Sequence, residues 1–128
     1  MPHFHAAVWL DHQSARVFEI GAEEVEKFTV HAHPKHRQVH HKHGALGSGH
    51  VEGDKQFFAE IAGLLRPAGE ILIAGPGKAK LEFQRFLHAH DPQTEKKVAA
   101  IETVDHPSDG QFVAFARRAF LKIDSMRG

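Results

Sequence analysis

Cysteine is absent from this chain of 128 residues, which excludes disulfide bonds and metal sites built on thiolates. No apolar run reaches the roughly 18 residues that a transmembrane helix needs, so we expect no membrane-spanning segment. The N-terminus has no basic stretch followed by an apolar one, and we therefore expect no signal peptide. These absences favour a cytoplasmic protein without a membrane partner.

An excess of positive charge is also missing. The formal net charge is +0 at pH 7 with histidine neutral, which argues against a uniformly basic nucleic-acid binder. There are 13 histidines, however, and unperturbed imidazoles in that number would add about +3 at pH 7 and about +10 at pH 6. Seven histidines lie between His31 and His50, in a stretch that has no acid before Glu52. The chain thus carries a local basic segment.

Several catalytic motifs are lacking. Gly75-Pro76-Gly77-Lys78 has neither the spacer nor the Lys-Ser/Thr pair of a Walker A loop, and Gly47-Ser48-Gly49 is not a nucleophile elbow. Two-metal nuclease chemistry needs converging carboxylates, but only Asp11 and Glu60 are plausibly placed. We interpret Asp11 as a turn residue whose side chain binds its own backbone. We expect no cofactor and a non-catalytic function.

Hydrophobic periodicity predicts eight elements. Alternating or continuous apolar runs indicate strands, and apolar residues three and four apart indicate helices. Ser108, followed by Gln111, is typical of a capping box at the start of the last helix. The predicted strands cover 5–10, 15–20, 25–32, 70–74 and 97–104, and the predicted helices cover 54–65, 78–90 and the residues after Ser108.

The element order is β-β-β-α-β-α-β-α. A meander followed by βαβ crossovers predicts an α/β fold with a mixed five-stranded sheet and helices on its faces, which is the order of a ribonuclease H-like domain. We expect residues 1–128 to form one such domain.

Residues 33–53, called the His-rich segment below, show no periodicity and contain several glycines. A loop of about 20 residues in a compact domain is either functional or disordered. Its Lys and Arg side chains could meet RNA phosphates while its imidazoles stack on bases. Its imidazoles could alternatively bind Zn²⁺, Ni²⁺ or Cu²⁺. The third possibility is a solvated loop with no specific ligand.

The segment Ile71–Lys80 predicts a buried strand, a Gly-Pro-Gly turn and a helix that begins with two lysines. Helix N-termini disfavour cations, by about 0.3–1 kcal/mol per charge. A tight turn explains the glycines but not Lys78 and Lys80. A bound anion, such as an RNA phosphate, would resolve the conflict.

The residues Ile71–Leu87 resemble the Gly-Pro-Gly strand-to-helix segment in the middle domain of archaeal and eukaryotic peptide release factors and of Pelota. In those domains a basic loop rich in His and Gly follows the third strand, and His40–His50 occupies that place here. The resemblance implies a translation-associated factor that contacts the ribosome, through ribosomal RNA or tRNA. It leaves the oligomeric state open.

The release-factor loop carries Gly-Gly-Gln, whereas this chain has Gly47-Ser48-Gly49-His50. We therefore expect an accessory factor without that hydrolytic motif. One alternative is a hydrolase of peptidyl- or aminoacyl-tRNA esters with His43 or His50 as base. The expected RNA contacts are Lys35, Arg37, His40, His41, Lys42, His43, Lys78 and Lys80. The other alternative is a metal-binding protein, whose expected ligands come from His31, His33, His36, His40, His41 and His43.

Overall fold

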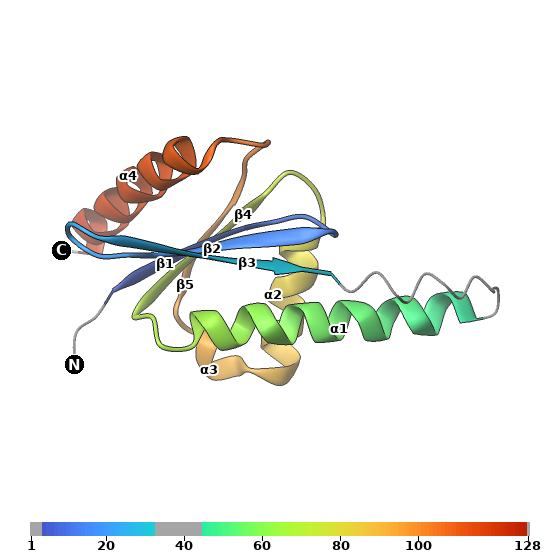
Figure 1. The fold of residues 1–128 in the computed structure, drawn as a ribbon. Helices are drawn as coiled ribbons and strands as arrows, with labels where there is room; N and C mark the ends of the chain where they lie inside the picture. Colours follow the sequence, from blue (N-terminus) through green and yellow to red (C-terminus); the bar gives the residue numbers. More distant parts are fainter. Residues whose placement is uncertain (1–3, 33–44, 128) are drawn as a thin grey trace.

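A five-stranded mixed sheet forms the centre of the computed structural model, which describes the backbone of residues 4–32 and 45–127 (Figure 1). The strand order is β3-β2-β1-β4-β5. β1 and β3 pair antiparallel to β2, whereas β4 pairs parallel to β1 and to β5. The strands are β1 (His5–Leu10), β2 (Ser14–Ile20), β3 (Val25–His31), β4 (Glu70–Gly75) and β5 (Val98–Thr103).

All five strands lie where the sequence predicts them, with ends that differ by at most one residue. The β1–β2 turn also follows the prediction for Asp11. Its Oδ1 accepts hydrogen bonds from the backbone N–H of Gln13 at 2.9 Å and of Ser14 at 3.0 Å. Asp11 therefore serves as a turn residue, as an Asx-turn requires.

Helices cover both faces of the sheet. They are α1 (Ala45–Leu65), α2 (Ala79–His90), α3 (Pro92–Glu95) and α4 (Asp109–Arg127). Because side chains alternate across a strand, Ala6, Val8 and Leu10 of β1 face α1 and α2, while Ala7 and Trp9 face α4. The face under α1 and α2 buries Phe57, Ile61, Leu65, Phe83 and Leu87, and the face under α4 buries Phe112, Ala116 and Phe120.

The predicted start of the first helix is wrong. α1 begins at Ala45 rather than Asp54, so the part of the His-rich segment from Ala45 to Gly53 is helical. Glycine disfavours a helix by about 1 kcal/mol, and the three glycines here predicted a loop. Once a helix is nucleated on packed residues, however, each added residue gains a backbone hydrogen bond. Residues 33–44 lie outside the described part of the chain.

The short helix α3 lies between the predicted helix 78–90 and the predicted strand 97–104, where the sequence patterns predict no element. Asp91 also caps α3, because its Oδ1 accepts a hydrogen bond from the Thr94 N–H at 3.4 Å, with Pro92 in the first turn. Its Oδ2 accepts a second hydrogen bond from the Thr94 hydroxyl at 2.9 Å. This cap adds one helical turn to the predicted order before β5.

The predicted capping box of α4 is confirmed. The Ser108 N–H donates to Gln111 Oε1 at 3.0 Å, and the Gln111 N–H donates to Ser108 Oγ at 3.2 Å. The two residues thus satisfy each other's free backbone donors. Among the described helices, none combines the length and the apolar character that crossing a bilayer requires.

Candidate nucleic-acid interface

One end of the sheet gathers the turns that the sequence singled out. The carboxyl ends of β1, β3 and β4 all lie there, and α2 begins beside them (Figure 1). In open α/β sheets, ligands bind outside the carboxyl ends of the strands. We call this region, formed by residues 11–14, 31–32, 75–82 and 104–107, the carboxyl end of the sheet.

Backbone hydrogen bonds hold these turns to one another. The Ala32 N–H donates to the carbonyl of Gln13 at 2.9 Å, and the Val104 N–H donates to the carbonyl of Gly75 at 3.1 Å. Ala32 is the last described residue before the His-rich segment. The chain therefore enters that segment beside the β1–β2 turn, and β1 is the direct neighbour of β4, which ends in the Gly-Pro-Gly turn.

The two lysines of the turn occupy different environments. Lys80 is only 7% exposed, and its Nζ donates to the carbonyl of Gly77 at 2.6 Å. Its alkyl stem is buried while its ammonium group caps a turn carbonyl that precedes the helix. Lys80 is thus accommodated near the N-terminus of α2 by a local hydrogen bond, which the sequence pattern did not reveal.

Lys78 stands at the N-cap of α2 and is exposed. Its backbone is in the right-handed helical region, and no side chain caps the helix there. Its carbonyl accepts from the N–H groups of Leu81 and Glu82, both at 3.0 Å. The first turn of α2 therefore presents backbone donors without a side-chain acceptor, beside an exposed ammonium group.

An exposed histidine lies next to this turn. His12, in the β1–β2 turn, places Nε2 2.9 Å from Oε1 of Glu82 in the first turn of α2. Their side chains are 54% and 37% exposed, so solvent screens the pair. Glu82 also lies where the helix dipole favours an acid. The contact ties the β1–β2 turn to α2.

The connection between β5 and α4, residues 104–107, also lies at the carboxyl end of the sheet. The Trp9 indole N–H donates to the carbonyl of Asp105 at 2.6 Å, and the His106 ring lies 5.0 Å from the Trp9 ring. His106 Nε2 is 3.9 Å from Oδ2 of Asp11. Carboxylates thus lie beside both imidazoles, so the described part of this end is not strongly basic by itself.

Most of the sequence-predicted contacts lie outside the described part of the chain. This holds for Lys35, Arg37 and Lys42, for the histidines at 33, 36, 40, 41 and 43, and for the side chain of His50. His31 is described and exposed at the end of β3. The structure therefore brings Lys78, Lys80 and the entry to the His-rich segment to one end of the sheet.

No protein-family model matches the chain. A curated Pelota homologue from Methanocella arvoryzae is 33% identical over 76 residues, which cover 57% of this chain and 21% of that protein. The chain resembles Pelota. It spans about a fifth of that relative's length.

Solved structures support the same fold. Pelota from Archaeoglobus fulgidus gives a TM-score of 0.66 at 20% identity, over 96% of this chain and 33% of that one. The archaeal translation termination factor aRF1 gives 0.60 at 20% identity, over 83% of this chain and 31% of that one. Pelota from Thermoplasma acidophilum gives a TM-score of 0.58 at 22% identity, over 88% of this chain and 31% of that one. The predicted α/β fold class is confirmed by this likeness to Pelota.

Sequence reasoning on this Pelota-like chain missed His12 and His106 as members of the carboxyl end. Both lie in short turns whose composition only indicates a loop. The available signal was positional: His12 follows the first strand by two residues, and His106 follows the fifth by three. Only the parallel pairing of β1, β4 and β5 places the ends of those strands together.

Proposed function

We propose that this chain is a translation-associated factor that binds the ribosome in the cytoplasm, through ribosomal RNA or tRNA, without catalysing a reaction. Two comparisons support the proposal: the sequence likeness to a Pelota homologue and the shared fold with a protein named as a translation termination factor. Because the matched proteins are several times longer than the matched region, their whole activity is not transferred.

The observation that carries the proposal is the position of Lys78. It is exposed at the uncapped N-terminus of α2, at the same end of the sheet where the chain enters the His-rich segment. A phosphate bound there would accept hydrogen bonds from the first-turn N–H groups and would pair with the ammonium group. An exposed cation would then be compensated at a helix end that otherwise disfavours it.

The remaining contacts of the proposed interface come from the His-rich segment. Cationic side chains there would meet further phosphates, and imidazoles would stack on exposed bases. Lys80 would contribute by fixing the Gly77 carbonyl, and so the shape of the turn on which Lys78 stands. The proposed segment contacts are Lys35, Arg37, His40, His41, Lys42 and His43.

The test is co-sedimentation of the untagged chain with ribosomes at several salt concentrations. We compare Lys78→Glu with Lys96→Glu, because Lys96 is also exposed but precedes β5 at the opposite end of the sheet. Losing one phosphate contact should weaken binding to ribosomes. The fall of log K with log salt concentration should become less steep, with a slope smaller in magnitude by about 1. Lys96→Glu should leave both the affinity and the slope unchanged.

A triple variant, Lys35→Gln/Arg37→Gln/Lys42→Gln, tests the His-rich segment without removing the first turns of α1. It should lower the salt slope by up to about 3. If the unmodified chain stays at the top of the gradient at every salt concentration, the proposed function is wrong. If it sediments with ribosomes but Lys78→Glu and the triple variant behave like Lys96→Glu, ribosome binding stands and the assigned surface is wrong.

A further inference from the structure

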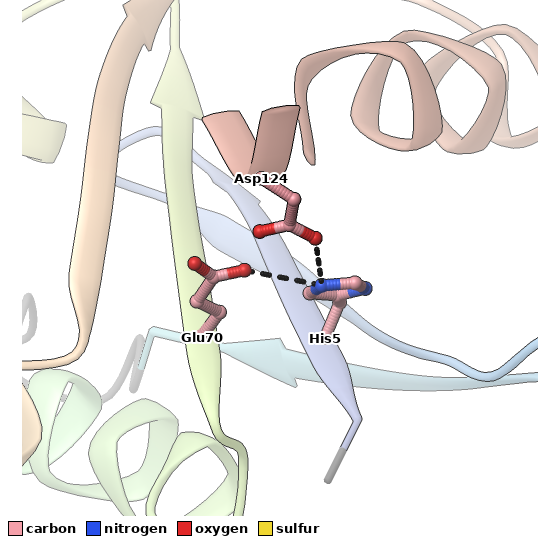
Figure 2. Close-up of side chains that lie close together, drawn as sticks. All are labelled: His5, Glu70 and Asp124. Atoms are coloured by element: carbon pink, nitrogen blue, oxygen red, sulfur yellow. Dashed lines mark ion pairs between the residues drawn. The ribbon is translucent and has the colours of Figure 1, made fainter. Parts of the chain in front are cut away.

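A second group of chemically active side chains lies at the opposite end of the sheet. His5, Glu70 and Asp124 point toward one another from the start of β1, the start of β4 and the C-terminal part of α4 (Figure 2). His5 Nε2 is 3.1 Å from Oε1 of Glu70 and 3.4 Å from Oδ2 of Asp124. This group is separate from the proposed ribosome-binding surface.

The register of the sheet explains why these residues meet. His5 and Glu70 are directly paired across the parallel strands β1 and β4. His5 is followed by Ala7 and Trp9 at two-residue intervals, and Glu70 is followed by Leu72 and Ala74; all four apolar residues pack on the α4 side. His5 and Glu70 therefore face α4, whose Asp124 completes the group.

Packing fixes the imidazole. The His5 ring stacks on the buried Phe120 ring with centroids 4.1 Å apart and planes 16° apart. Phe120 lies one helical turn before Asp124, so the stack also fixes α4 against the imidazole. The Glu70 side chain is 12% exposed, whereas those of His5 and Asp124 are 35% and 47% exposed. The group is thus anchored on its inner side and open to solvent on its outer side.

We propose that His5, Glu70 and Asp124 bind one divalent transition-metal ion of the Zn²⁺ type. In tetrahedral zinc sites the ligands lie about 2.0–2.1 Å from the metal, so neighbouring ligand atoms are about 3.3 Å apart. The two distances from His5 Nε2, 3.1 and 3.4 Å, match that spacing. All three ligand atoms lie within 4.8 Å of one another. The half-exposed Asp124 side chain can rotate to shorten the distance between its carboxylate oxygen and that of Glu70.

The donor set selects the metal class. A neutral imidazole and two carboxylates carry two negative charges, which one divalent ion cancels. Imidazole nitrogen suits Zn²⁺ and its transition-metal neighbours, whereas Mg²⁺ and Ca²⁺ prefer oxygen ligands alone. Three protein ligands leave the fourth, solvent-facing position for water. The bound ion would clip α4 to the starts of β1 and β4, segments far apart in the chain.

The test must separate this site from the His-rich segment. We use the full chain with His33, His36, His40, His41, His43 and His50 replaced by Ser, and titrate it with Zn²⁺ by calorimetry in a buffer that does not bind metals. One equivalent of Zn²⁺ should bind and raise the unfolding temperature, while Mg²⁺ should do neither. A Zn²⁺ titration that shows no saturable equivalent overturns the proposal.

Isosteric variants in that background locate the site. Glu70→Gln and Asp124→Asn should each weaken Zn²⁺ binding by at least about tenfold, since even outer-shell changes weaken metal sites tenfold or more. His5→Phe should abolish binding while keeping an aromatic ring against Phe120. The matched control is Glu23→Gln, an exposed acid in the β2–β3 turn, which should bind as its parent does.

Folding defects do not obscure the result. Each variant is first compared with its parent by circular dichroism in a chelator. If Glu70→Gln unfolds, Asp124→Asn still tests the site, because it changes a side chain that is half-exposed. The visible absorption of bound Co²⁺ gives a second measure of coordination. Equal Zn²⁺ affinity in the parent and in folded Asp124→Asn would show that the three side chains form an ion-pair cluster only, and the proposal would be wrong.

Discussion

Gly75 packs against the backbone of Leu10 so closely that a Cβ atom at position 75 would overlap the Leu10 carbonyl oxygen. The two residues follow the Trp9–Ala74 pair at the carboxyl ends of the parallel strands β1 and β4. The first glycine of the Gly-Pro-Gly turn is thus required by the approach of two strands, and the obstructing atom is backbone rather than a flexible side chain. Gly77, in contrast, has open space where its Cβ would lie.

We expect Gly75→Ala to lower the free energy of unfolding by about 1–3 kcal/mol, because the two strand ends must separate to accept the methyl group. Gly77→Ala should be neutral or stabilising by up to about 1 kcal/mol, since alanine reduces the entropy of the unfolded chain. Urea denaturation measures both. Equal effects of the two substitutions would contradict the assigned role of Gly75.

The capping box of α4 gives a second prediction. Ser108→Ala should destabilise the protein by about 1 kcal/mol, because the Gln111 N–H loses its acceptor at the helix N-terminus. Ser125→Ala makes the same chemical change near the other end of α4 and should change stability by less than about 0.5 kcal/mol. The midpoints of denaturant unfolding of the two variants measure the difference. A similar loss of stability in Ser108→Ala and Ser125→Ala would mean that the cap contributes nothing specific.

Asp109 makes stability depend on pH. A hydrogen bond from Lys27 lowers the pKa of Asp109 below its ordinary value. Burial acts in the opposite direction, and a hydrogen bond from Arg16 lowers the pKa further. A lowered folded-state pKa stabilises the protein above the unfolded pKa, and that contribution is lost as the pH falls through the folded value. Asp109→Asn should therefore reduce stability at pH 7, by no more than about 1 kcal/mol because solvent screens the 43% exposed side chain.

The destabilisation by Asp109→Asn should shrink as the pH falls below the ordinary carboxyl pKa of about 3.9. Thermal unfolding at pH 7 and pH 3 measures the difference. Asp105→Asn, at a 93% exposed side chain, is the control and should show little change at either pH. An effect of Asp109→Asn that is the same at both pH values would remove the ionic explanation.

Two acids oppose each other on the β2–β3 hairpin. Glu19 and Glu26 are paired across the strands, and burial together with the charge of Glu26 raises the pKa of Glu19. A raised folded-state pKa means that this carboxyl favours folding at low pH and that the benefit is lost as the pH rises through that value. Like charges directly opposite in a sheet are destabilising.

Glu26→Gln should consequently stabilise the protein at pH 7, by about 0.2–1 kcal/mol. The gain should be lost by pH 4, where Glu19 is already protonated because its pKa is raised. Differential scanning calorimetry across that range follows the effect. Glu102→Gln is the matched control, because Glu102 is an exposed residue of the edge strand β5. A gain that persists undiminished at pH 4 would point to a cause other than charge repulsion.

Local patterns in the sequence determined the elements of this protein. Alternation and helical periodicity located all five strands and the packed parts of the three long helices, and the Ser108 capping box and the Asp11 turn are as predicted. These features depend on residues near one another in the chain, so a local pattern contains the needed physics. The start of α1 was mistaken because glycine propensity is a weak term that helix propagation from packed residues can override.

Tertiary structure alone decided which residues meet. The burial of Lys80, the contact of His12 with Glu82, and the meeting of His5, Glu70 and Asp124 all depend on strand register and on where a helix crosses a sheet face. A one-residue slip in register would move His5 to the other face of the sheet, although its sequence would be unchanged. The sequence by itself therefore determines the elements and the approximate fold, while the long-range pairing of β1 with β4 decides which side chains share a site.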